Sequence, residues 1–526
     1  MSPSTTRRRG FLAPPKRPAE ARKPRLPRSF VPRTVDLLAF DLGAESGRAI
    51  LGRYDGDRLR LFEVHRFANG PVRAPDGIHW DVRRLFTEVR RGLALCGQQY
   101  GTPASIGVDT WGVDFALLDR HGELLGDPFH YRDGRTNGVI EQAFRRVPRQ
   151  EIFQQTGIQF MQFNTLYQLF SMALAGSPVL KSARTFLTIP DLFNYWLSGR
   201  AVCEFTNATT TQFYDPRAGA WATSLLEKFG IPTRFLPEVV SPGTVLGGLL
   251  PSVAEETGLG AVPVVAPACH DTGSAVAAVP ASGADYAYIS SGTWSLVGAE
   301  VREPVITAES LANNFTNEGG VGGTFRLLKN VQALWLLQEC RRAWAEQGQD
   351  ISYDDLVRMA EAAPPFAALV DPDDPSFLSP PDMSAAIEAF CTATRQPPPR
   401  DRGATVRCVL ESLALKYRWV LERIEEMRRR PISVVHVVGG GCRNGLLCRF
   451  TADATGLPVL AGPVEATAAG NVIVQAMALG HLSSLDEGRA LVRRSFEVTQ
   501  YEPGERGPWD EAYGRFKEIL SPVGTA

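Results

Sequence analysis

The chain has 526 residues, of which 44% are hydrophobic and 21% charged, and its formal net charge at pH 7 is −1. This composition is typical of a globular protein with a sizeable core, and the length suggests two to four domains. A net charge near zero gives no field that would draw the chain to nucleic acid or to a membrane, and no apolar run approaches the roughly 18 residues that span a bilayer. The eight cysteines are scattered without a Cys-x-x-Cys pair, which indicates buried thiols in a reducing compartment rather than disulfides or a zinc site.

Residues 1–34 differ in composition from the rest of the chain. They are rich in Lys, Arg and Pro and contain one acidic residue, Glu20. The prolines exclude a regular helix, and the long apolar segment of a secretory signal is missing. We therefore expect a disordered basic extension, with a transit peptide or a nucleic-acid-binding arm as the alternatives.

The segment that follows predicts a mixed α/β unit. A helix begins after Asp81, because apolar residues recur there at helical spacing and Asp is a good capping residue. Asp55-Gly56 predicts a tight turn between two strands. The predicted strands are Val35–Phe40, Arg48–Tyr54, Leu59–His65, Ala104–Asp109 and Val113–Asp119.

The second half of the chain repeats this theme. It contains a predicted hairpin, a long amphipathic helix over 406–424, a buried strand and a last buried helix over 470–479. Two α/β lobes are expected, 35–275 and 276–510, each with a hairpin facing a central cleft, followed by a C-terminal tail, 511–526. The predicted strands are Tyr286–Ser290, Leu296–Val301 and Ile432–Val438, and the predicted surface loops are 371–382 and 396–400.

Asp271 is the residue best suited to act as a general base. It follows an apolar run, 263–268, in the sequence Cys-His-Asp-Thr-Gly-Ser-Ala, and therefore lies at a junction between a strand and a helix. A rigid strand end beside helix N–H groups is a good position for a proton acceptor. The alternative is that Asp271 only caps the next helix.

Two glycine- and hydroxyl-containing loops suit phosphate. In 41–48 (Asp-Leu-Gly-Ala-Glu-Ser-Gly-Arg), the glycines permit a tight turn with outward N–H groups, and Asp41 could hold Mg²⁺ through water. In 290–295 (Ser-Ser-Gly-Thr-Trp-Ser), hydroxyl groups surround Gly292. An ordinary glycine hairpin and an ordinary Ser/Thr turn are the respective alternatives.

Two further loops lie beside predicted strands. The three glycines of 439–444 would let a flat ligand such as adenosine lie against the backbone, or would simply end a strand and cap a helix. In 109–114, Gly112 permits close approach of a ligand, and Trp111 offers either a face for a sugar or a core aromatic. His270 either binds a substrate hydroxyl or satisfies a strand end.

With these loops in order, the chain resembles the FGGY carbohydrate kinases of the actin/hexokinase/Hsp70-like superfamily. The run Asp109–Phe115 and the Gly-Gly-Gly-Cys ending at Cys442 are typical of members that phosphorylate L-rhamnulose, and differ from the glycerol and xylulose kinases. The matching segments run in family order across 35–510: 41–48, 106–115, 131–137, 157–160, 163–169, 206–212, 270–272, 290–296, 316–320, 328–330, 334–338, 438–442 and 462–466.

The resemblance implies an α/β fold of two ribonuclease H-like (actin/hexokinase-like) lobes around a central cleft, with sugar and phosphate on the first lobe and nucleotide on the second. It implies transfer of the γ-phosphoryl group of ATP to the 1-hydroxyl of L-rhamnulose in the cytoplasm, with Mg²⁺, and as a monomer or homodimer. Carried over residue by residue, Asp271 is the base. The implied sugar-binding residues are Gly112, His270, Asp271, Thr272 and Asn330, and the implied ATP-binding residues are Ala44, Glu45, Ser46, Gly47, Arg48, Thr293, Gln338 and Gly440. The expected metal residue is Asp41, from its position at a strand end.

Some features depart from the family pattern, and other functions compete with this interpretation. Family phosphate loops prefer Thr and Ser where Ala44 and Glu45 stand, so we expect the acidic side chain of Glu45 to point away from ATP. One rival is a sibling kinase that acts on fuculose, xylulose or glycerol. Another is a chaperone-like ATPase of the same superfamily, against which His270-Asp271 and the lack of a peptide-binding domain both argue. A nucleic-acid-binding protein is disfavoured by the net charge.

Overall fold

A six-stranded sheet forms the centre of the first half of the chain in this computed structural model, which describes residues 34–520. The strand order is β13-β14-β6-β1-β2-β3. Strands β1, β2 and β3 are antiparallel neighbours, whereas β6 and β14 run parallel to β1. The bounds are β1 Val35–Leu42, β2 Ser46–Tyr54, β3 Leu59–Ala68, β6 Ser105–Thr110, β13 Thr244–Gly248 and β14 Pro263–Ala266.

A seven-stranded sheet, in the order β17-β18-β16-β15-β19-β20-β21, forms the centre of the second half. Strands β15, β16 and β18 are antiparallel neighbours, and β19 and β20 run parallel to β15. The bounds are β15 Tyr286–Ser291, β16 Trp294–Val301, β17 Thr316–Gly319, β18 Phe325–Gln332, β19 Val434–Val438, β20 Val459–Ala461 and β21 Thr499–Tyr501.

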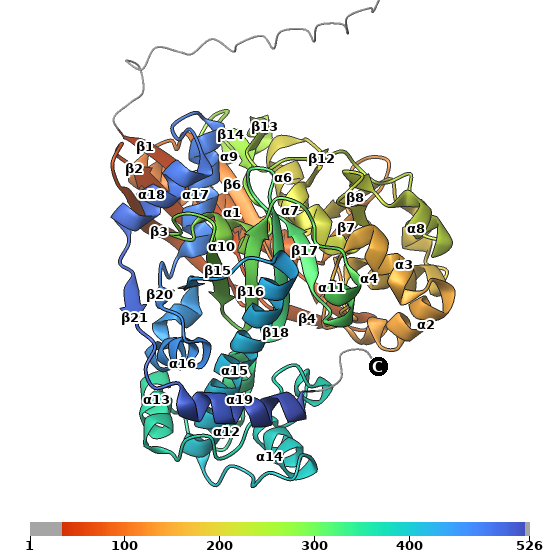
Figure 1. The fold of residues 1–526 in the computed structure, drawn as a ribbon. Coiled ribbons are helices and arrows are strands. Elements are labelled where there is room, and N and C mark those ends of the chain that lie inside the picture. The colour runs from red at the N-terminus through yellow and green to blue at the C-terminus, as the bar shows by residue number, and fades with distance from the viewer. Residues whose placement is uncertain (1–33, 521–526) are drawn as a thin grey trace, which may run out of the picture. The chain divides into compact units, whose positions relative to one another are not determined.

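The two sheets share one topology. In each, three antiparallel strands are followed by two parallel strands and an antiparallel edge strand, namely β13 in the first sheet and β21 in the second; the second sheet has one more strand, β17, which pairs antiparallel with β18 at its other edge. The predicted α/β fold with two similar, ribonuclease H-like lobes is confirmed. Figure 1 shows the two sheets with their helices.

Ten helices belong to the first half of the described chain. Their bounds are α1 Val82–Tyr100, α2 Val139–Arg146, α3 Arg149–Thr156, α4 Thr165–Leu174, α5 Pro178–Ser182, α6 Ile189–Ser198, α7 Phe205–Ala208, α8 Thr223–Lys228, α9 Pro251–Thr257 and α10 Asp271–Ala277, with 3₁₀ turns η1 Gly134–Thr136 and η2 Thr209–Thr211. Four small sheets pair β4 Pro71–Ala74 with β5 Gly77–Trp80, β7 Phe115–Leu118 with β8 Thr185–Thr188, β9 Cys203–Glu204 with β12 Val239–Val240, and β10 Tyr214–Asp215 with β11 Ala220–Trp221.

The helices of the second half cover its sheet and form a separate layer at one end (Figure 1). Their bounds are α11 Ala308–Ala312, α12 Trp335–Glu346, α13 Tyr353–Ala362, α14 Met383–Ala393, α15 Arg402–Arg428, α16 Gly445–Thr455, α17 Ala466–Ala478, α18 Leu485–Ser495 and α19 Gly507–Ile519, with 3₁₀ turns η3 Pro375–Phe377 and η4 Gly440–Arg443.

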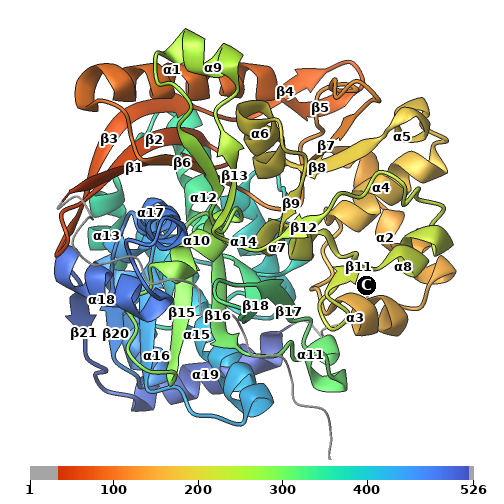
Figure 2. The ribbon, with the colours of Figure 1, turned by 90° about the horizontal axis from the view of Figure 1, so that it is seen from above.

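Helices α10 and α17 lie between the two sheets, as the view in Figure 2 shows. Both helices share one apolar core with β1 and β15, which includes Leu37, Val276, Tyr288 and Val472. On its other side, α17 forms polar contacts with the first sheet. Gln475 Nε2, for example, donates a hydrogen bond to the Leu38 carbonyl at 3.1 Å. The described residues therefore form a single compact unit although they contain two sheets.

The strand predicted over 113–119 begins later than expected. Val113 has φ 66, a left-handed conformation that a β-branched residue rarely adopts, and β7 starts only at Phe115. Because β7 pairs with β8 alone, it is also not part of the main sheet.

The loop predicted at the surface over 371–382 is partly buried. The Asp371 carboxylate accepts a hydrogen bond from Lys416 Nζ at 2.7 Å, and both residues are almost fully buried. Phe377, in the middle of the loop, is 0% exposed. The acidic and proline-rich composition suggested a solvent-exposed loop. The loop is partly buried because Asp371 pairs with Lys416 on α15 and because Phe377 packs in the hydrophobic core.

Helix α19 corrects the expected C-terminal tail. Ala512, Tyr513 and Phe516 of this helix are buried in the core of the second lobe, so the lobe extends at least to Ile519. The expected basic extension lies outside the described residues except for Thr34, and so do residues 521–526. All eight cysteines are buried free thiols, as predicted. Between residues 34 and 520, none of the helices combines the length and apolar character that crossing a bilayer requires.

Candidate active site

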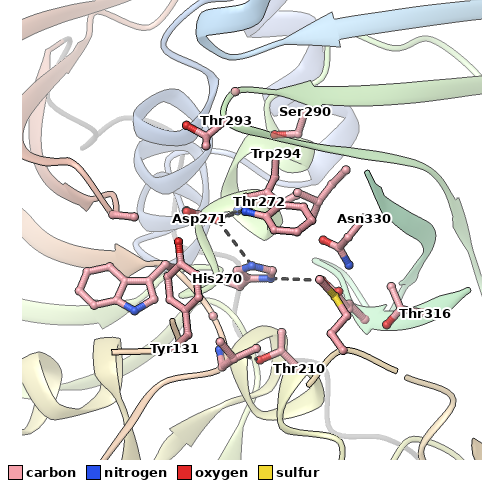
Figure 3. A pocket seen from close by; sticks show the side chains of 18 of the residues that line it. Tyr131, Thr210, His270, Asp271, Thr272, Ser290, Thr293, Trp294, Thr316 and Asn330 are labelled. Carbon is pink, nitrogen blue, oxygen red and sulfur yellow. Dashed lines mark hydrogen bonds and ion pairs between the residues drawn. The ribbon is translucent and has the colours of Figure 1, made fainter. Parts of the chain in front are cut away.

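A cavity of about 340 Å³ opens between the two sheets and is lined by residues of both lobes. Figure 3 shows His270 and Asp271 between Thr293 and Ser290 on one side and Tyr131 and Thr210 on the other. The lining residues from the first lobe include Ala44, Trp111, Gly112, Tyr131, Gln159, Asn164, Thr210, His270, Asp271 and Thr272, and those from the second lobe include Ser290, Thr293, Trp294, Glu318, Asn330, Gly439 and Gly440.

The strand-to-helix junction places Asp271 in this cavity. It is the first residue of α10, and its carboxylate accepts hydrogen bonds from the Thr272 backbone N–H at 2.5 Å and the Thr272 hydroxyl at 3.1 Å. Burial raises the pKa of Asp271, and the nearby Asp41 carboxylate raises it further, while His270 opposes this shift. A half-exposed carboxylate with a raised pKa is better suited to accept a proton than an ordinary surface Asp.

His270 is fixed from behind by a buried ion pair. Its Nδ1 lies 3.2 Å from Glu318 Oε2 and accepts a hydrogen bond from Arg326 at 3.1 Å, while its Nε2 lies 3.5 Å from Asp271 Oδ1. Burial acts to raise the pKa of Glu318, but Arg326 and His270 outweigh it and lower this pKa overall. The sequence prediction missed both Glu318 and Arg326, although residues 316–320 matched the family pattern.

The sugar residues expected from the resemblance come together in the cavity. Gly112, Thr272 and Asn330 all line it. A Cβ on Gly112 would lie 3.3 Å from His270 Nε2 and 3.3 Å from Thr210 Oγ1, so a larger residue would crowd this wall. Trp111 was expected either to offer a face to the sugar or to be a core aromatic. It lines the cavity and is also part of the hydrophobic core of the first lobe.

Gln159 is a further cavity residue that the sequence prediction missed. It is buried, and its Oε1 accepts hydrogen bonds from the Asn330 backbone N–H at 2.9 Å and from Asn330 Nδ2 at 3.2 Å. This contact joins the two lobes directly beside the cavity. The match of segment 157–160 to the family pattern was the one feature that could have pointed to Gln159. The composition of the segment did not indicate a role for it.

Only part of the expected nucleotide set lines the same cavity. Ala44, Thr293 and Gly440 do so. A Cβ on Gly440 would meet no atom within 4 Å, so the backbone here faces open space. A Cβ on Gly441 would lie 2.0 Å from Ser291 Oγ, which explains why glycine is needed where this loop packs against β15.

Glu45, Ser46, Gly47, Arg48 and Gln338 are not among the lining residues. Glu45 is exposed at the tip of the β1–β2 hairpin. Arg48 pairs with Asp41 at 2.5 Å and also with Glu465 of the second lobe. On α12, Gln338 has a buried Oε1 without a hydrogen-bond partner, which leaves this atom available to a ligand.

The carboxylates of Asp41, Asp109 and Asp271 influence one another at the end of the first sheet. Asp41 and Asp109 are paired residues on neighbouring strands, and burial, with added repulsion from Asp41 and Asp271, holds the pKa of Asp109 well above its usual range. Within residues 34–520, however, no three His, Cys, Asp or Glu side chains group closely enough to hold a metal among themselves. This donor set fits Mg²⁺ that is held through water and nucleotide phosphates, as Mg²⁺ usually is.

Known proteins resemble the chain over almost its whole length. It is 47% identical over 485 residues to a rhamnulokinase of Bacteroides thetaiotaomicron, a match covering 92% of this chain and 99% of that protein. It is 42% identical to a rhamnulokinase of Halalkalibacterium halodurans, covering 89% and 99%.

Solved structures share the fold at lower identity. A gluconate kinase of Lactobacillus acidophilus gives a TM-score of 0.77 at 16% identity, covering 92% of this chain and 97% of that chain. A xylulose kinase of Rhodospirillum rubrum gives 0.74 at 20% identity, covering 93% and 98%. The N-terminal domain of the FGGY family of carbohydrate kinases matches residues 37–278, and the C-terminal domain of that family matches residues 287–479. The chain therefore belongs to the FGGY family of carbohydrate kinases.

Proposed function

We propose that this chain transfers the γ-phosphoryl group of ATP to the 1-hydroxyl of L-rhamnulose and so forms L-rhamnulose 1-phosphate in L-rhamnose catabolism. The observation that carries the proposal is the position of Asp271, a carboxylate with a raised pKa in a cavity that both lobes line. The relatives at 47% and 42% identity, which are rhamnulokinases, support the choice of sugar. A cytoplasmic location is part of the proposal.

The proposed chemistry is an in-line transfer with Asp271 as general base. The carboxylate accepts the proton of the attacking hydroxyl, the sugar oxygen forms a bond to the γ-phosphorus, and ADP leaves. Such reactions need alignment and charge neutralisation more than covalent assistance from the protein. His270, Gly112, Thr272 and Asn330 would orient the sugar so that its 1-hydroxyl lies next to Asp271.

The phosphate groups would lie between the two hairpin turns. We assign the γ-phosphate to the backbone N–H groups of 44–48 and to the 290–295 turn, with Thr293 contributing its hydroxyl. Mg²⁺ held beside Asp41 would supply positive charge to the triphosphate. Arg48 would keep Asp41 in place, since their side chains already form an ion pair in this structure. Gly440 and Gln338 would contact the rest of the nucleotide.

The test is a substrate panel with purified protein. ATP consumption is measured with L-rhamnulose, L-fuculose, D-xylulose and glycerol, and ³¹P NMR identifies the phosphorylated position. We expect the highest kcat/KM with L-rhamnulose and a 1-phosphate product. A higher kcat/KM with another acceptor would reassign the substrate, and ATP hydrolysis at the same rate with and without sugar would favour a non-kinase ATPase.

A further inference from the structure

Asp114 joins several parts of the wall of the sugar cavity through one buried carboxylate. The residue is 1% exposed. Its Oδ2 accepts hydrogen bonds from Trp80 Nε1 at 2.6 Å, from Trp111 Nε1 at 3.0 Å and from the Tyr131 backbone N–H at 3.2 Å. Its Oδ1 accepts a hydrogen bond from Gln168 Nε2 at 2.8 Å. Four donors from four separate segments therefore converge on this side chain.

Three of the four donor residues, Trp80, Trp111 and Tyr131, belong to a continuous row of packed aromatic rings. The ring centroids of Trp111 and Trp80 are 4.0 Å apart, those of Trp80 and His130 are 4.2 Å apart, and those of His130 and Tyr131 are 4.6 Å apart. Trp111 and Tyr131, the two ends of this row, both line the cavity. The Asp114 carboxylate thus bonds the indole rings of Trp111 and Trp80 and the backbone of Tyr131 in this aromatic wall.

The backbone around Asp114 is held in a strained turn. The Asp114 N–H donates to the Gly112 carbonyl at 2.9 Å, and between them Val113 has φ 66. A turn of this kind, closed from residue i to i+2 around a left-handed β-branched residue, is rare and persists only where its surroundings hold it. Here the Val113 carbonyl accepts hydrogen bonds from Thr165 Oγ1 at 2.6 Å and from Gln168 Nε2 at 3.3 Å.

Asp114 acts on the cavity through its neighbours and not by contact. Among the described residues, those that line the cavity include Trp111, Gly112 and Tyr131 but not Asp114. We propose that Asp114 is a positioning residue for the sugar: its carboxylate holds the aromatic wall and the Gly112–Asp114 turn in one preformed shape. The proposal rests on the proposed function, because it assigns this cavity to the ketose.

The expected consequence follows from the cost of ordering a binding site. If the wall is already ordered, no conformational entropy is lost in ordering it when the sugar binds. If the wall is loosened, this entropy is lost on binding and the affinity for the sugar falls. Replacing the carboxylate by an amide of the same shape puts an NH₂ group opposite at least one buried donor. This donor is Gln168 Nε2 if the amide oxygen takes the place of Oδ2, and the indole N–H groups of Trp80 and Trp111 if it takes the place of Oδ1. Losing a buried hydrogen bond to a charged acceptor is worth about 10- to 100-fold in an equilibrium constant.

The experiment compares Asp114→Asn with Asp119→Asn. Asp119 is on the same lobe, and its carboxylate accepts backbone N–H bonds at a surface turn away from the cavity. For Asp114→Asn we expect the sugar KM to rise about 10- to 100-fold with a smaller change in kcat, while ADP affinity without sugar stays within about twofold. The indole N–H resonances of Trp80 and Trp111 in NMR should shift. Asp119→Asn should match the wild type in all these measurements.

A second variant keeps the test decisive if Asp114→Asn does not fold. Trp80→Phe retains a ring in the row but removes one donor to Asp114, and Trp80 is not among the cavity residues described for this structure. It should raise the sugar KM in the same direction by a smaller factor. An unchanged sugar KM in a folded Asp114→Asn or Trp80→Phe variant would overturn the proposal, and so would an equal loss of sugar and ADP affinity. Each variant is assayed with whichever ketose the wild type phosphorylates best, so a wrong choice of sugar would appear first in the wild type.

Discussion

Asp271 is well placed for proton transfer because its environment raises the pKa of the carboxylate while hydrogen bonds hold the side chain in position. Burial raises its pKa, yet Thr272 donates two hydrogen bonds to the carboxylate and His270 Nε2 lies 3.5 Å away. The ring of His270 is in turn fixed by Arg326 and Glu318. The proposed base therefore has a defined position before any substrate arrives.

The first prediction concerns this carboxylate. Asp271→Asn should keep the fold and ADP binding but lower kcat for sugar phosphorylation by about 10²- to 10⁴-fold, because the amide cannot accept the proton. Steady-state kinetics and ADP titration measure the two effects. Asp57→Asn, at a side chain that is 75% exposed, is the matched control and should behave like the wild type. A variant at position 271 with near-normal kcat would remove Asp271 from the mechanism.

The second prediction concerns stability and pH. Burial raises the pKa of Asp191 to about 8 and that of Glu204 to about 7, and the two residues are joined by a hydrogen bond from the Glu204 N–H to Asp191 Oδ1 at 3.0 Å. Because these folded-state pKa values lie above the unfolded ones, the folded state holds extra protons above about pH 4. Its stability should therefore fall as pH rises towards 8, by up to about 1.4 kcal/mol per pH unit for each proton.

The test of this effect uses Asp191→Asn, since an amide resembles the protonated acid in shape and bonding. The free energy of unfolding is measured by denaturant titration between pH 5 and pH 8 for both proteins. The variant should lose less stability than the wild type over this range. Equal slopes would show that Asp191 keeps its charge in the folded state.

At the level of elements, sequence patterns predicted the turns and helix starts that are stabilised by interactions between neighbouring residues. The hairpin at Asp55-Gly56 formed as expected, because Asp55 accepts two backbone N–H bonds and Gly56 has φ 96. The helix after Asp81 begins with the expected cap on the Arg84 N–H. These elements depend on residues close to them in the chain, so their sequences alone are sufficient.

The elements that were missed depend on distant partners. Val113 adopts a left-handed conformation only because Thr165 and Gln168 hold its carbonyl, and no local propensity predicts that. The loop around Asp371 is buried through Lys416, a residue 45 positions away. The same limit applies to the site: Asp114 and Gln159 also lie in segments that matched the family pattern, but their roles come from contacts with distant residues, which only the fold creates.

The third prediction tests the corrected C-terminal boundary. Phe516 of α19 is 0% exposed in the core of the second lobe. Phe516→Ala should therefore destabilise the protein by about 3–5 kcal/mol through the lost burial and the cavity it leaves. Thermal and denaturant unfolding measure this loss. Glu518→Ala, on the exposed side of the same helix, should change stability by less than about 0.5 kcal/mol. Equal effects of the two substitutions would mean that α19 does not pack as described.

In the whole molecule, two kinds of contact join the lobes. Helices α10 and α17 form an apolar core between the sheets, with Asp271 at the start of α10. On the sugar side, segment 157–160 of the first lobe bonds the second lobe: Gln159 contacts Asn330, and Phe160 N–H donates to Asn314 Oδ1 at 2.8 Å. If the sugar binds beside these bridging contacts as proposed, we expect it to favour a closed arrangement of the lobes, by the difference in its affinity for the closed and open arrangements.

The last prediction separates a sugar contact by Asn330 from its role in joining the lobes. Asn330→Ala removes an amide that lines the cavity and also bonds Gln159 at 3.2 Å. Asn314→Gly removes a bridge to Phe160 outside the lining residues and suits the φ of 53 at this position. If Asn330 binds the sugar, Asn330→Ala should raise the sugar KM about tenfold. It should also lower kcat if the bond tightens in the transition state.

The matched control should show a smaller increase in KM, and both variants should bind ADP without sugar as the wild type does. Equal increases in KM for the two substitutions would mean that Asn330 acts only by holding the lobes together. A strong loss of ADP affinity in Asn330→Ala would instead place this residue in the nucleotide site or in the fold. Because both asparagines bond segment 157–160 of the first lobe, the difference between their effects measures what the sugar itself gains from Asn330.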